Sequence, residues 1–227
     1  MKKKDGMITA ELHCHTEYSR DSSNRILPLI QAARSRGIDR LAITDHNTIR
    51  GARIAKEKAP ELIIIGEEIL TSEGELLAYY LTEEIPRGLS PMQTIAEIRK
   101  QGGFIVVPHP FDKMRHGWRL ENLLTLLPHV DALETFNARC LHPRLNQQAA
   151  ALAGEKHLLR TAGSDAHSLV ELGLTVIRLP AFDSAEELRA ALREGEINGR
   201  MLSPLDHFKA SLAIGTGRLN PFKKKKI

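Results

Sequence analysis

The chain is poor in cysteine, in aromatic residues and in long hydrophobic runs, and each shortage excludes a class of protein. Its two cysteines, Cys14 and Cys140, are too few for a disulfide framework, which predicts a reducing, cytoplasmic location. Aromatic residues make up 4% of the chain, too few for the stacking platform of a single-strand nucleic-acid binder. No apolar run approaches the length of a membrane span, and no signal-peptide core follows the first lysines.

The net charge of +4 comes from the two ends of the chain. Residues 2–4 and 223–226 are seven lysines, and without them 25 basic residues stand against 28 acidic ones. Basic ends can attract nucleic acid or an anionic surface, but solvated, mobile tails are the more ordinary outcome. We therefore expect one domain over residues 1–227 with lysine-rich tails and no membrane partner, and nucleic acid is a possible but less favoured partner. The oligomeric state leaves no signal in the sequence.

Strand-like and helix-like segments alternate along the chain. Apolar runs at 62–65 and 104–107 suit strands buried on both faces, and a further strand is expected at 174–179. Helices are expected at 28–36, 48–58, 91–101, 120–127, 143–153 and 184–193. Such alternation implies parallel pairing with right-handed crossovers. Seven or eight such units in this length favour a closed βα barrel over an open sheet.

The first apolar run ends in two histidines with one residue between them. On a strand, alternate side chains share a face, so His13 and His15 point the same way and Cys14 points the other. Two imidazoles on one face at a strand terminus can hold one divalent cation. Cys14 is then expected to be a buried thiol that packs like a small hydrophobic residue.

Metal-seeking side chains also follow the later apolar runs. These positions are Asp45, His46, Glu67, Glu68, His109, Glu134, Asp165 and His167. Five of the ten histidines thus stand where a predicted strand stops. A barrel collects the C-terminal ends of many strands on one face, whereas an open sheet gathers its functional groups at one switch point. The pattern predicts one shared site at the top of a barrel.

Five motifs resemble those of the PHP family, the polymerase and histidinol phosphatase domain. They are His13-x-His15-Thr16, Thr44-Asp45-His46, Gly66-x-Glu68, Pro108-His109-Pro110 and Gly163-Ser164-Asp165-Ala166-His167, in the family's order. The resemblance spans about residues 8–179 and implies a distorted TIM-like (β/α)7 barrel with two or three divalent ions, manganese, iron or zinc. Amidohydrolases share the HxH opening, but their bridging lysine has no candidate here.

The resemblance also implies three groups of metal ligands. The groups are His13, His15, Glu68 and Asp165; Glu68, His109 and Glu134; and Asp21, His46 and His167. Relatives often have His or Cys where Glu134 stands, and many have a histidine within residues 75–77, where this chain has none. Glu67 and Glu68 compete for one role, since strand alternation turns only one of them to the site, and the family spacing favours Glu68.

The resemblance implies hydrolysis of a phosphoester by a metal-activated hydroxide. Glu68 would bridge the ions, and Asp45 or His46 could donate a proton or orient a ligand. Loop cations could bind the phosphoryl oxygens, and the candidates are Arg139, Arg115, His116 and Arg20. A small phosphorylated metabolite or nucleotide is the leading substrate. A 3'-5' nuclease acting on nucleic-acid ends and a non-catalytic metal-binding module are the alternatives.

Overall fold

A computed structural model describes residues 6–203 and 205–206 of the chain, so the lysine-rich ends lie outside the described residues. The described strands form one sheet in the order β7-β6-β5-β4-β3-β2-β1-β8-β9. They are β1 (Met7–Cys14), β2 (Arg40–Ile43), β3 (Ile63–Leu70), β4 (Glu75–Tyr79), β5 (Phe104–Val107), β6 (Ala132–Asn137), β7 (Leu159–Gly163), β8 (Thr175–Pro180) and β9 (Glu196–Gly199).

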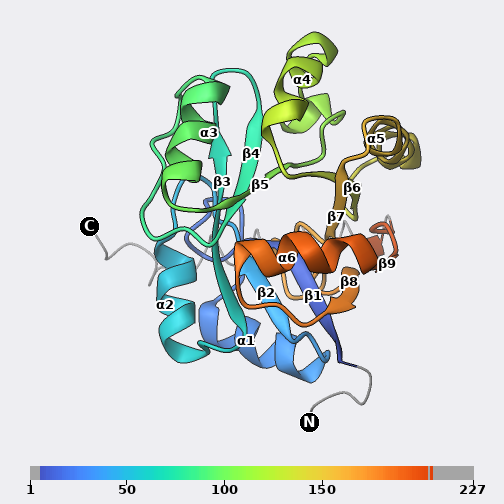
Figure 1. Cartoon of the computed structure of the whole chain (residues 1–227). Helices are drawn as coiled ribbons and strands as arrows, with labels where there is room; N and C mark the ends of the chain where they lie inside the picture. The colour runs from blue at the N-terminus through green and yellow to red at the C-terminus, as the bar shows by residue number, and fades with distance from the viewer. Residues whose placement is uncertain (1–5, 204, 207–227) are drawn as a thin grey trace.

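The sheet curls until its β7 edge returns to β1, as the ribbon in Figure 1 shows. Just beyond β7, the Ala166 carbonyl accepts a 3.0 Å hydrogen bond from the His15 amide. The Ala166 amide in turn donates to the His13 carbonyl at 3.3 Å. These contacts nearly close a barrel with helices between the strands, so the predicted distorted barrel is confirmed.

The prediction of uniformly parallel pairing is wrong for part of the sheet. Strands β1, β2 and β3 pair in parallel, as do β5, β6 and β7, but β4 is antiparallel to both β3 and β5. The reason is the connection: only residues 71–74 join β3 to β4, whereas a parallel crossover needs a dozen residues or more. Strand β8 also runs antiparallel to β1, and the unpredicted β9 extends that edge.

The six α-helices of the described chain lie close to the predicted segments. They are α1 (Ile26–Ser35), α2 (Arg50–Lys58), α3 (Pro91–Lys100), α4 (Leu120–Leu126), α5 (Pro143–Glu155) and α6 (Ala185–Ala191), with 3-10 turns at Lys113–Arg115, Leu127–His129 and Leu192–Glu194. Helix α3 begins as its sequence predicts, with Pro91 in its first turn and a capping box between Ser90 and Gln93. Helix α2 begins later than expected because Asn47 accepts a hydrogen bond from the Leu70 amide, which ties it to β3.

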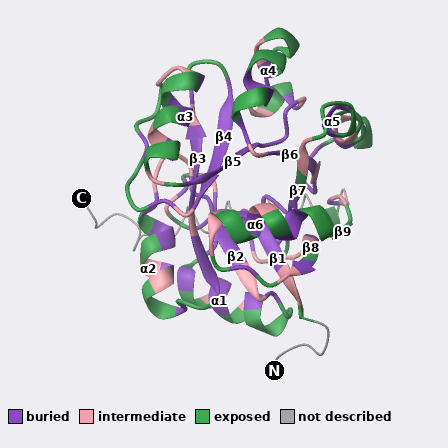
Figure 2. Cartoon of the chain, in the orientation of Figure 1, coloured by how far each residue is buried: buried purple, intermediate pink, exposed green. Residues whose placement is uncertain are grey.

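Side chains of alternating strand positions fill two different layers. Leu77 and Tyr79 of β4 pack inside the barrel with Leu12, and the Tyr79 hydroxyl donates to the Leu12 carbonyl at 2.8 Å. Leu76 and Ala78 face outward, against the layer that includes helix α3. Figure 2 shows this division as buried strands within helices that are exposed on their outer sides. The pleat of each strand therefore decides which residues can reach the mouth of the barrel.

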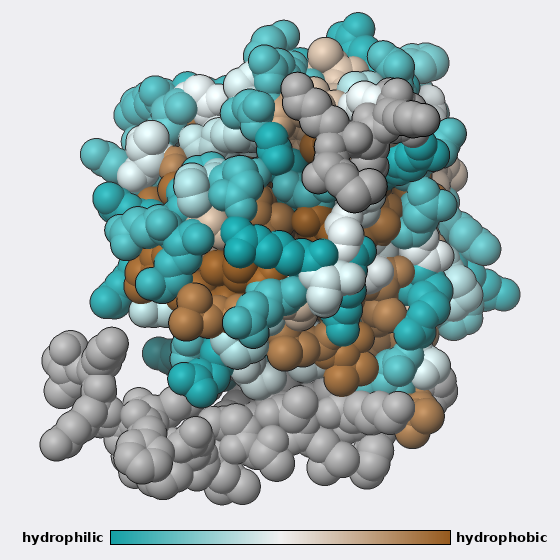
Figure 3. Space-filling view, turned by 90° about the horizontal axis from the view of Figure 1, so that it is seen from below, coloured by the Kyte–Doolittle hydropathy of each residue, from teal (hydrophilic) through white to brown (hydrophobic). Residues whose placement is uncertain are grey.

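The end of the barrel where β1 begins has a surface of mixed hydropathy. In the view from below, hydrophobic side chains are visible between hydrophilic ones (Figure 3). A cavity of about 620 Å³ lies at this end, and its lining includes Ile8, Arg34 and Glu61.

Across residues 6–203 and 205–206, every helix is too short or too polar to cross a bilayer.

Candidate metal centre

The predicted ligands gather at the C-terminal end of the parallel strands. A cavity of about 340 Å³ opens there, with walls that include Asp21, His46, Glu68, His109, Asp165 and His167. His13 and His15 are fully buried and contact two of these wall residues, Glu68 and Asp165. Segments far apart in the sequence thus place their imidazoles and carboxylates in one volume.

The first predicted group is compact, and two of its imidazole nitrogens have no hydrogen-bonding partner among the described residues. His15 Nε2 lies 3.2 Å from Asp165 Oδ1 and 3.3 Å from Glu68 Oε2. His13 Nε2 lies 3.5 Å from an oxygen of each of these two carboxylates. Both Nε2 atoms are buried, and no described residue forms a hydrogen bond with them. Buried polar atoms without partners are rare, and two imidazoles facing two carboxylates suit a divalent cation.

Glu68 is the centre of the arrangement. Besides His13 and His15, its oxygens lie 3.0 Å from His109 Nε2 and 3.0 Å from His46 Nδ1. Four imidazoles therefore surround one carboxylate that is 1% exposed. Strand β3 extends to Leu70 through Glu68, and the register that pairs Glu68 with Leu77 turns it inward. Glu67 faces the other way and accepts a hydrogen bond from the Ile85 amide.

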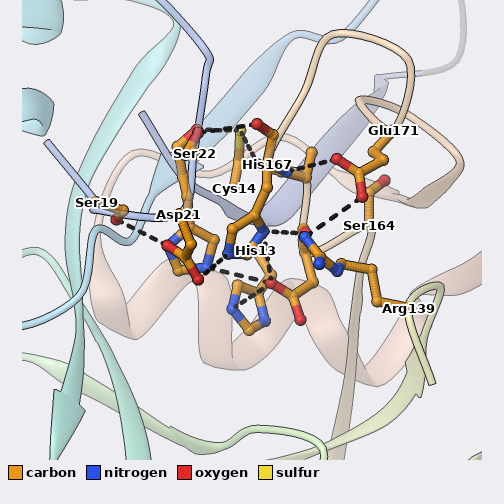
Figure 4. Close-up of polar contacts among 12 residues, drawn as sticks. His13, Cys14, Ser19, Asp21, Ser22, Arg139, Ser164, His167 and Glu171 are labelled. Carbon is orange, nitrogen blue, oxygen red and sulfur yellow. Dashed lines mark hydrogen bonds and ion pairs between the residues drawn. The ribbon is translucent and has the colours of Figure 1, made fainter. Parts of the chain in front are cut away.

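The third predicted group forms beside the first. Asp21 Oδ2 lies 3.2 Å from His167 Nε2 and 3.5 Å from His46 Nε2. The ring centroids of His15 and His167 are 4.2 Å apart, which joins this group to the first. Figure 4 shows Asp21 and His167 close together beside His13. Asp21 lies in an ordinary polar loop, and the structure brings it to the two histidines with which the resemblance grouped it.

Charge within the cluster sets the protonation of its members. Burial raises the pKa of Glu68, but the neighbouring His13, His46 and His109 outweigh it and hold that pKa well below its usual value. Burial likewise opposes ionisation of Asp165, whose pKa is nonetheless lowered by His13 and Arg115. Burial and then the charges of His167 and His46 lower the pKa of His15 to about 3. His15 is therefore neutral, the form in which imidazole binds a metal.

Two of the candidate ligands lie on strained backbone. His109, just after β5, has a φ of 25°, and Asp165, just after β7, has a φ of 53°. Residues other than glycine seldom adopt these left-handed angles, which cost on the order of 1–3 kcal/mol and concentrate at functional sites. The strain turns both side chains toward Glu68 and the two buried histidines.

Asp45 does not line the cavity, and of its two predicted roles, donating a proton or orienting a ligand, its contacts favour the second. Its fully buried carboxylate accepts hydrogen bonds from the Thr16 amide and hydroxyl, both at 2.6 Å, and from the Ser19 hydroxyl at 2.7 Å. The Ser19 hydroxyl also lies 3.2 Å from His15 Nδ1. Asp45 thus fastens the loop after β1 and, through Ser19, the ring of His15, which makes it a positioning residue.

Glu134 lies in the cluster, but hydrogen bonds occupy both of its oxygens. Oε1 is 2.9 Å from His13 Nδ1, while Oε2 accepts from the His109 amide at 2.9 Å and from Asn137 Nδ2 at 3.0 Å. Asn137 also donates to Asp165 at 3.2 Å, so it links two predicted ligands. The sequence did not mark Asn137 as a site residue; its only signal was its position after Glu134 at the end of the same strand.

The predicted substrate-binding residues divide into three that face the cavity and one that does not. Arg115, His116 and Arg139 contribute to its wall, whereas the exposed Arg20 does not. The Arg115 guanidinium forms ion pairs with Asp165 and Asp112. Arg139 Nη1 lies 3.3 Å from Glu171 Oε1, and Figure 4 shows the side chain approaching from beside the cluster.

Glu75 is a site residue that the sequence did not reveal. It is 6% exposed, lies in the cavity wall, and places Oε2 3.9 Å from His109 Nε2. Burial and the neighbouring Glu68 raise the pKa of Glu75 to about 9. The sequence predicts metal ligands at the C-terminal ends of strands, whereas Glu75 is the first residue of its strand.

Comparison with known proteins identifies the family of these motifs. The chain matches the PHP domain model over residues 11–167 and the PHP-associated model over residues 143–197. An uncharacterized protein of Methanocaldococcus jannaschii, MJ1587, is 40% identical over 146 residues, which are 58% of this chain and 82% of that protein.

Solved structures share the fold at low sequence identity. A two-domain protein of Bacteroides vulgatus that contains a predicted PHP-like metal-dependent phosphoesterase superimposes with a TM-score of 0.69 at 20% identity, over 92% of this chain and 70% of that one. The lesion-specific endonuclease EndoQ of Pyrococcus furiosus gives a TM-score of 0.57 at 16% identity, over 84% of this chain and 57% of that one. These likenesses establish the fold.

Proposed function

The chain belongs to the PHP domain family, and on this premise we propose that it is a metal-dependent phosphoesterase acting on a small phosphorylated metabolite or nucleotide. The observation that carries the proposal is the environment of Glu68, whose buried carboxylate lies within 3.5 Å of four imidazoles. Two of these, His13 and His15, present Nε2 atoms without a hydrogen-bonding partner among the described residues. Such a donor set suits manganese, iron or zinc.

We assign the ligands of two or three ions by these distances. The first ion would lie among His13, His15, Glu68 and Asp165, and a second beside Glu68 and His109. A third would take Asp21, His46 and His167. When bound, such ions lower the pKa of coordinated water and neutralise phosphoryl oxygens.

The chain's own residues would then bind and orient the substrate. Arg139 and Arg115 present guanidinium groups to the cavity wall, where they can donate paired hydrogen bonds to phosphoryl oxygens. His116 extends the same wall. In a centre of two ions, His46, the most exposed of the five imidazoles at 30%, would donate a proton to the leaving oxygen; in a centre of three ions it is a ligand.

The size of the cavity supports a small substrate. A volume of about 340 Å³ is at the lower end of the range for pockets that hold small molecules. The nuclease alternative draws support from the fold shared with the Pyrococcus furiosus endonuclease. A non-catalytic metal-binding module is disfavoured because the cavity wall also carries Arg115 and Arg139, which metal binding alone would not require.

A phosphate-release screen with metal analysis tests the proposal. Purified full-length protein would be supplied with manganese, iron or zinc and assayed against nucleotides, sugar phosphates, an aryl phosphate and oligonucleotides, with metal content measured in the same sample. We expect hydrolysis of a small phosphoester that stops on chelation. Trimming of oligonucleotides alone would favour the nuclease, and full metal loading without turnover would favour the binding module.

A further inference from the structure

We propose that Glu75, rather than Glu134, completes the second metal site with Glu68 and His109, while Glu134 acts as a positioning residue for His13. This inference rests on the metal centre of the proposed function. It differs from the resemblance, which assigned the second site to Glu134 and named no ligand within residues 75–77.

The direction of β4 explains how Glu75 reaches the site. Because β4 is antiparallel to β3 and β5, its first residue lies at the same end of the barrel as the last residues of its neighbours. Strand alternation then places Glu75 on the face of Leu77 and Tyr79, which point inward. The register pairs Leu70 with Glu75 and Glu68 with Leu77, so Glu68 and Glu75 lie on the same face of the pair, about two positions apart.

Contacts of the Glu75 carboxylate are those of a cation ligand. Ligand atoms of Glu75, Glu68 and His46 all lie within 4.8 Å of one another. Glu75 Oε2 is 3.9 Å from His109 Nε2, and within the described residues no lysine or arginine forms an ion pair with Glu75. Two buried carboxyl groups this close can both be ionised only beside a positive partner, and buried charges are usually paired or coordinate metals.

The backbone of Glu75 is held firmly in this position. The Trp118 indole nitrogen donates to the Glu75 carbonyl at 3.1 Å. The same indole packs against Gly74, where a Cβ would come within 2.5 Å of the ring. Trp118 is 2% exposed, so this contact belongs to the packed interior. A ligand on a rigid element suits a metal site, because coordination tolerates little displacement.

Glu134, in contrast, forms hydrogen bonds with residues around the proposed metal site and would hold a ligand in place without binding an ion itself. Its Oε1 contact with His13 Nδ1 leaves His13 Nε2 directed at Glu68 and Asp165. Its Oε2 accepts from the His109 amide and from Asn137, so both oxygens of Glu134 already have hydrogen-bonding partners. A carboxylate that holds one nitrogen of a ligating histidine fixes the tautomer and the ring orientation, which is the work of an outer-shell residue.

Metal binding by matched glutamine variants separates the two roles. The number of ions per full-length chain and their dissociation constants would be measured by elemental analysis and by titration with Mn²⁺ followed by electron paramagnetic resonance. The variants are Glu75→Gln, Glu134→Gln and the control Glu67→Gln. Glu67 is also a buried β3–β4 carboxyl, but it bonds to the Ile85 amide and not to the cluster.

We expect Glu75→Gln to bind one ion fewer than wild type, because a carboxamide is a poor substitute for a ligating carboxylate. Glu134→Gln should keep the full number of ions and weaken them by about 10- to 100-fold, as loss of an outer partner does. Glu67→Gln should match wild type. Glu75→His should regain the ion, because imidazole is also a ligand, which separates loss of a ligand from a failure to fold.

Two results would overturn the inference while leaving the proposed function intact. One is a Glu75→Gln protein that binds as many ions as Glu67→Gln, whatever their affinities. The other is a Glu134→Gln protein that loses an ion outright. A wild-type protein that binds no divalent ion would instead refute the proposed function itself, and this inference with it.

Discussion

The two ends of the barrel both carry cavities and charged residues, yet only one has the properties of a reactive site. The cavity where β1 begins is the larger, about 620 Å³ against about 340 Å³. Its charges are satisfied in water: Arg34 and Glu61 pair at 2.6 Å while more than half exposed. At the other end, charged groups are buried and two imidazole nitrogens have no hydrogen-bonding partner among the described residues. Unsatisfied buried polarity, and not volume, distinguishes the site.

The largest expected effect is the loss of Glu68, the carboxylate that four imidazoles surround. We expect Glu68→Gln to remove bound metal and to lower kcat/KM by more than about 100-fold. This exceeds the loss of about 10- to 100-fold that follows when a residue hydrogen-bonded to a metal ligand is removed. Metal analysis and steady-state kinetics on the same preparation measure both. The matched variant at the opposite end, Glu61→Gln, breaks an exposed pair and should change neither. If the two variants had the same metal content and the same kcat/KM, the two ends of the barrel would not differ in function.

A smaller effect is expected for the arginine beside the cavity. Arg139→Ala should raise KM by about 10- to 100-fold, the worth of one or two charge-assisted hydrogen bonds, with metal content unchanged. Arg34→Ala removes the same charge at the opposite end and should leave KM as it is. An unaltered KM in Arg139→Ala would show that Arg139 does not bind substrate and that its role is the structural ion pair with Glu171.

The smallest effect concerns stability at the end of the barrel away from the histidine cluster. Burial raises the pKa of Asp131, but hydrogen bonds from Arg99, the Ile105 amide and Arg189 outweigh it and lower that pKa. A lowered pKa stabilises the fold above the unfolded value near 4, and this stabilisation is lost as the pH falls through the folded pKa.

We therefore expect Asp131→Asn to lose about 1 kcal/mol of unfolding free energy at pH 7, with a smaller difference from wild type below pH 4. Denaturant unfolding at several pH values measures this, and catalysis should be unaffected. A difference that grows on acidification would have the wrong sign for a carboxylate that is ionised in the folded state.

The sequence predicted the barrel and most of the cluster because both follow from one rule. In a barrel, the last residues of parallel strands share a face, so His13, His15, His109 and Asp165 could be grouped before any coordinates existed. Glu75 escaped because β4 is reversed, which brings its first residue, not its last, to that face. The four-residue turn at 71–74 was the available signal.

Two other predicted site residues make contacts that no spacing encodes. Asp45 stands beside His46 in the sequence but turns to Thr16 and Ser19, which contribute three donors to its carboxylate. Glu134 occupies a ligand position of the family but is engaged by His13 and the His109 amide. Strand position predicts which residues reach the site, whereas the hydrogen bonds of their side chains become known only from the structure.

The central claim is that the end of the barrel with unsatisfied buried groups is where metal binds. Anomalous diffraction from crystals of the full-length protein grown with Mn²⁺ tests it directly. We predict a peak about 2.0–2.3 Å from Nε2 of His13 and of His15, shared with oxygens of Glu68 and Asp165. Manganese peaks confined to the larger cavity at the opposite end, or no peak among these four residues, would contradict the account.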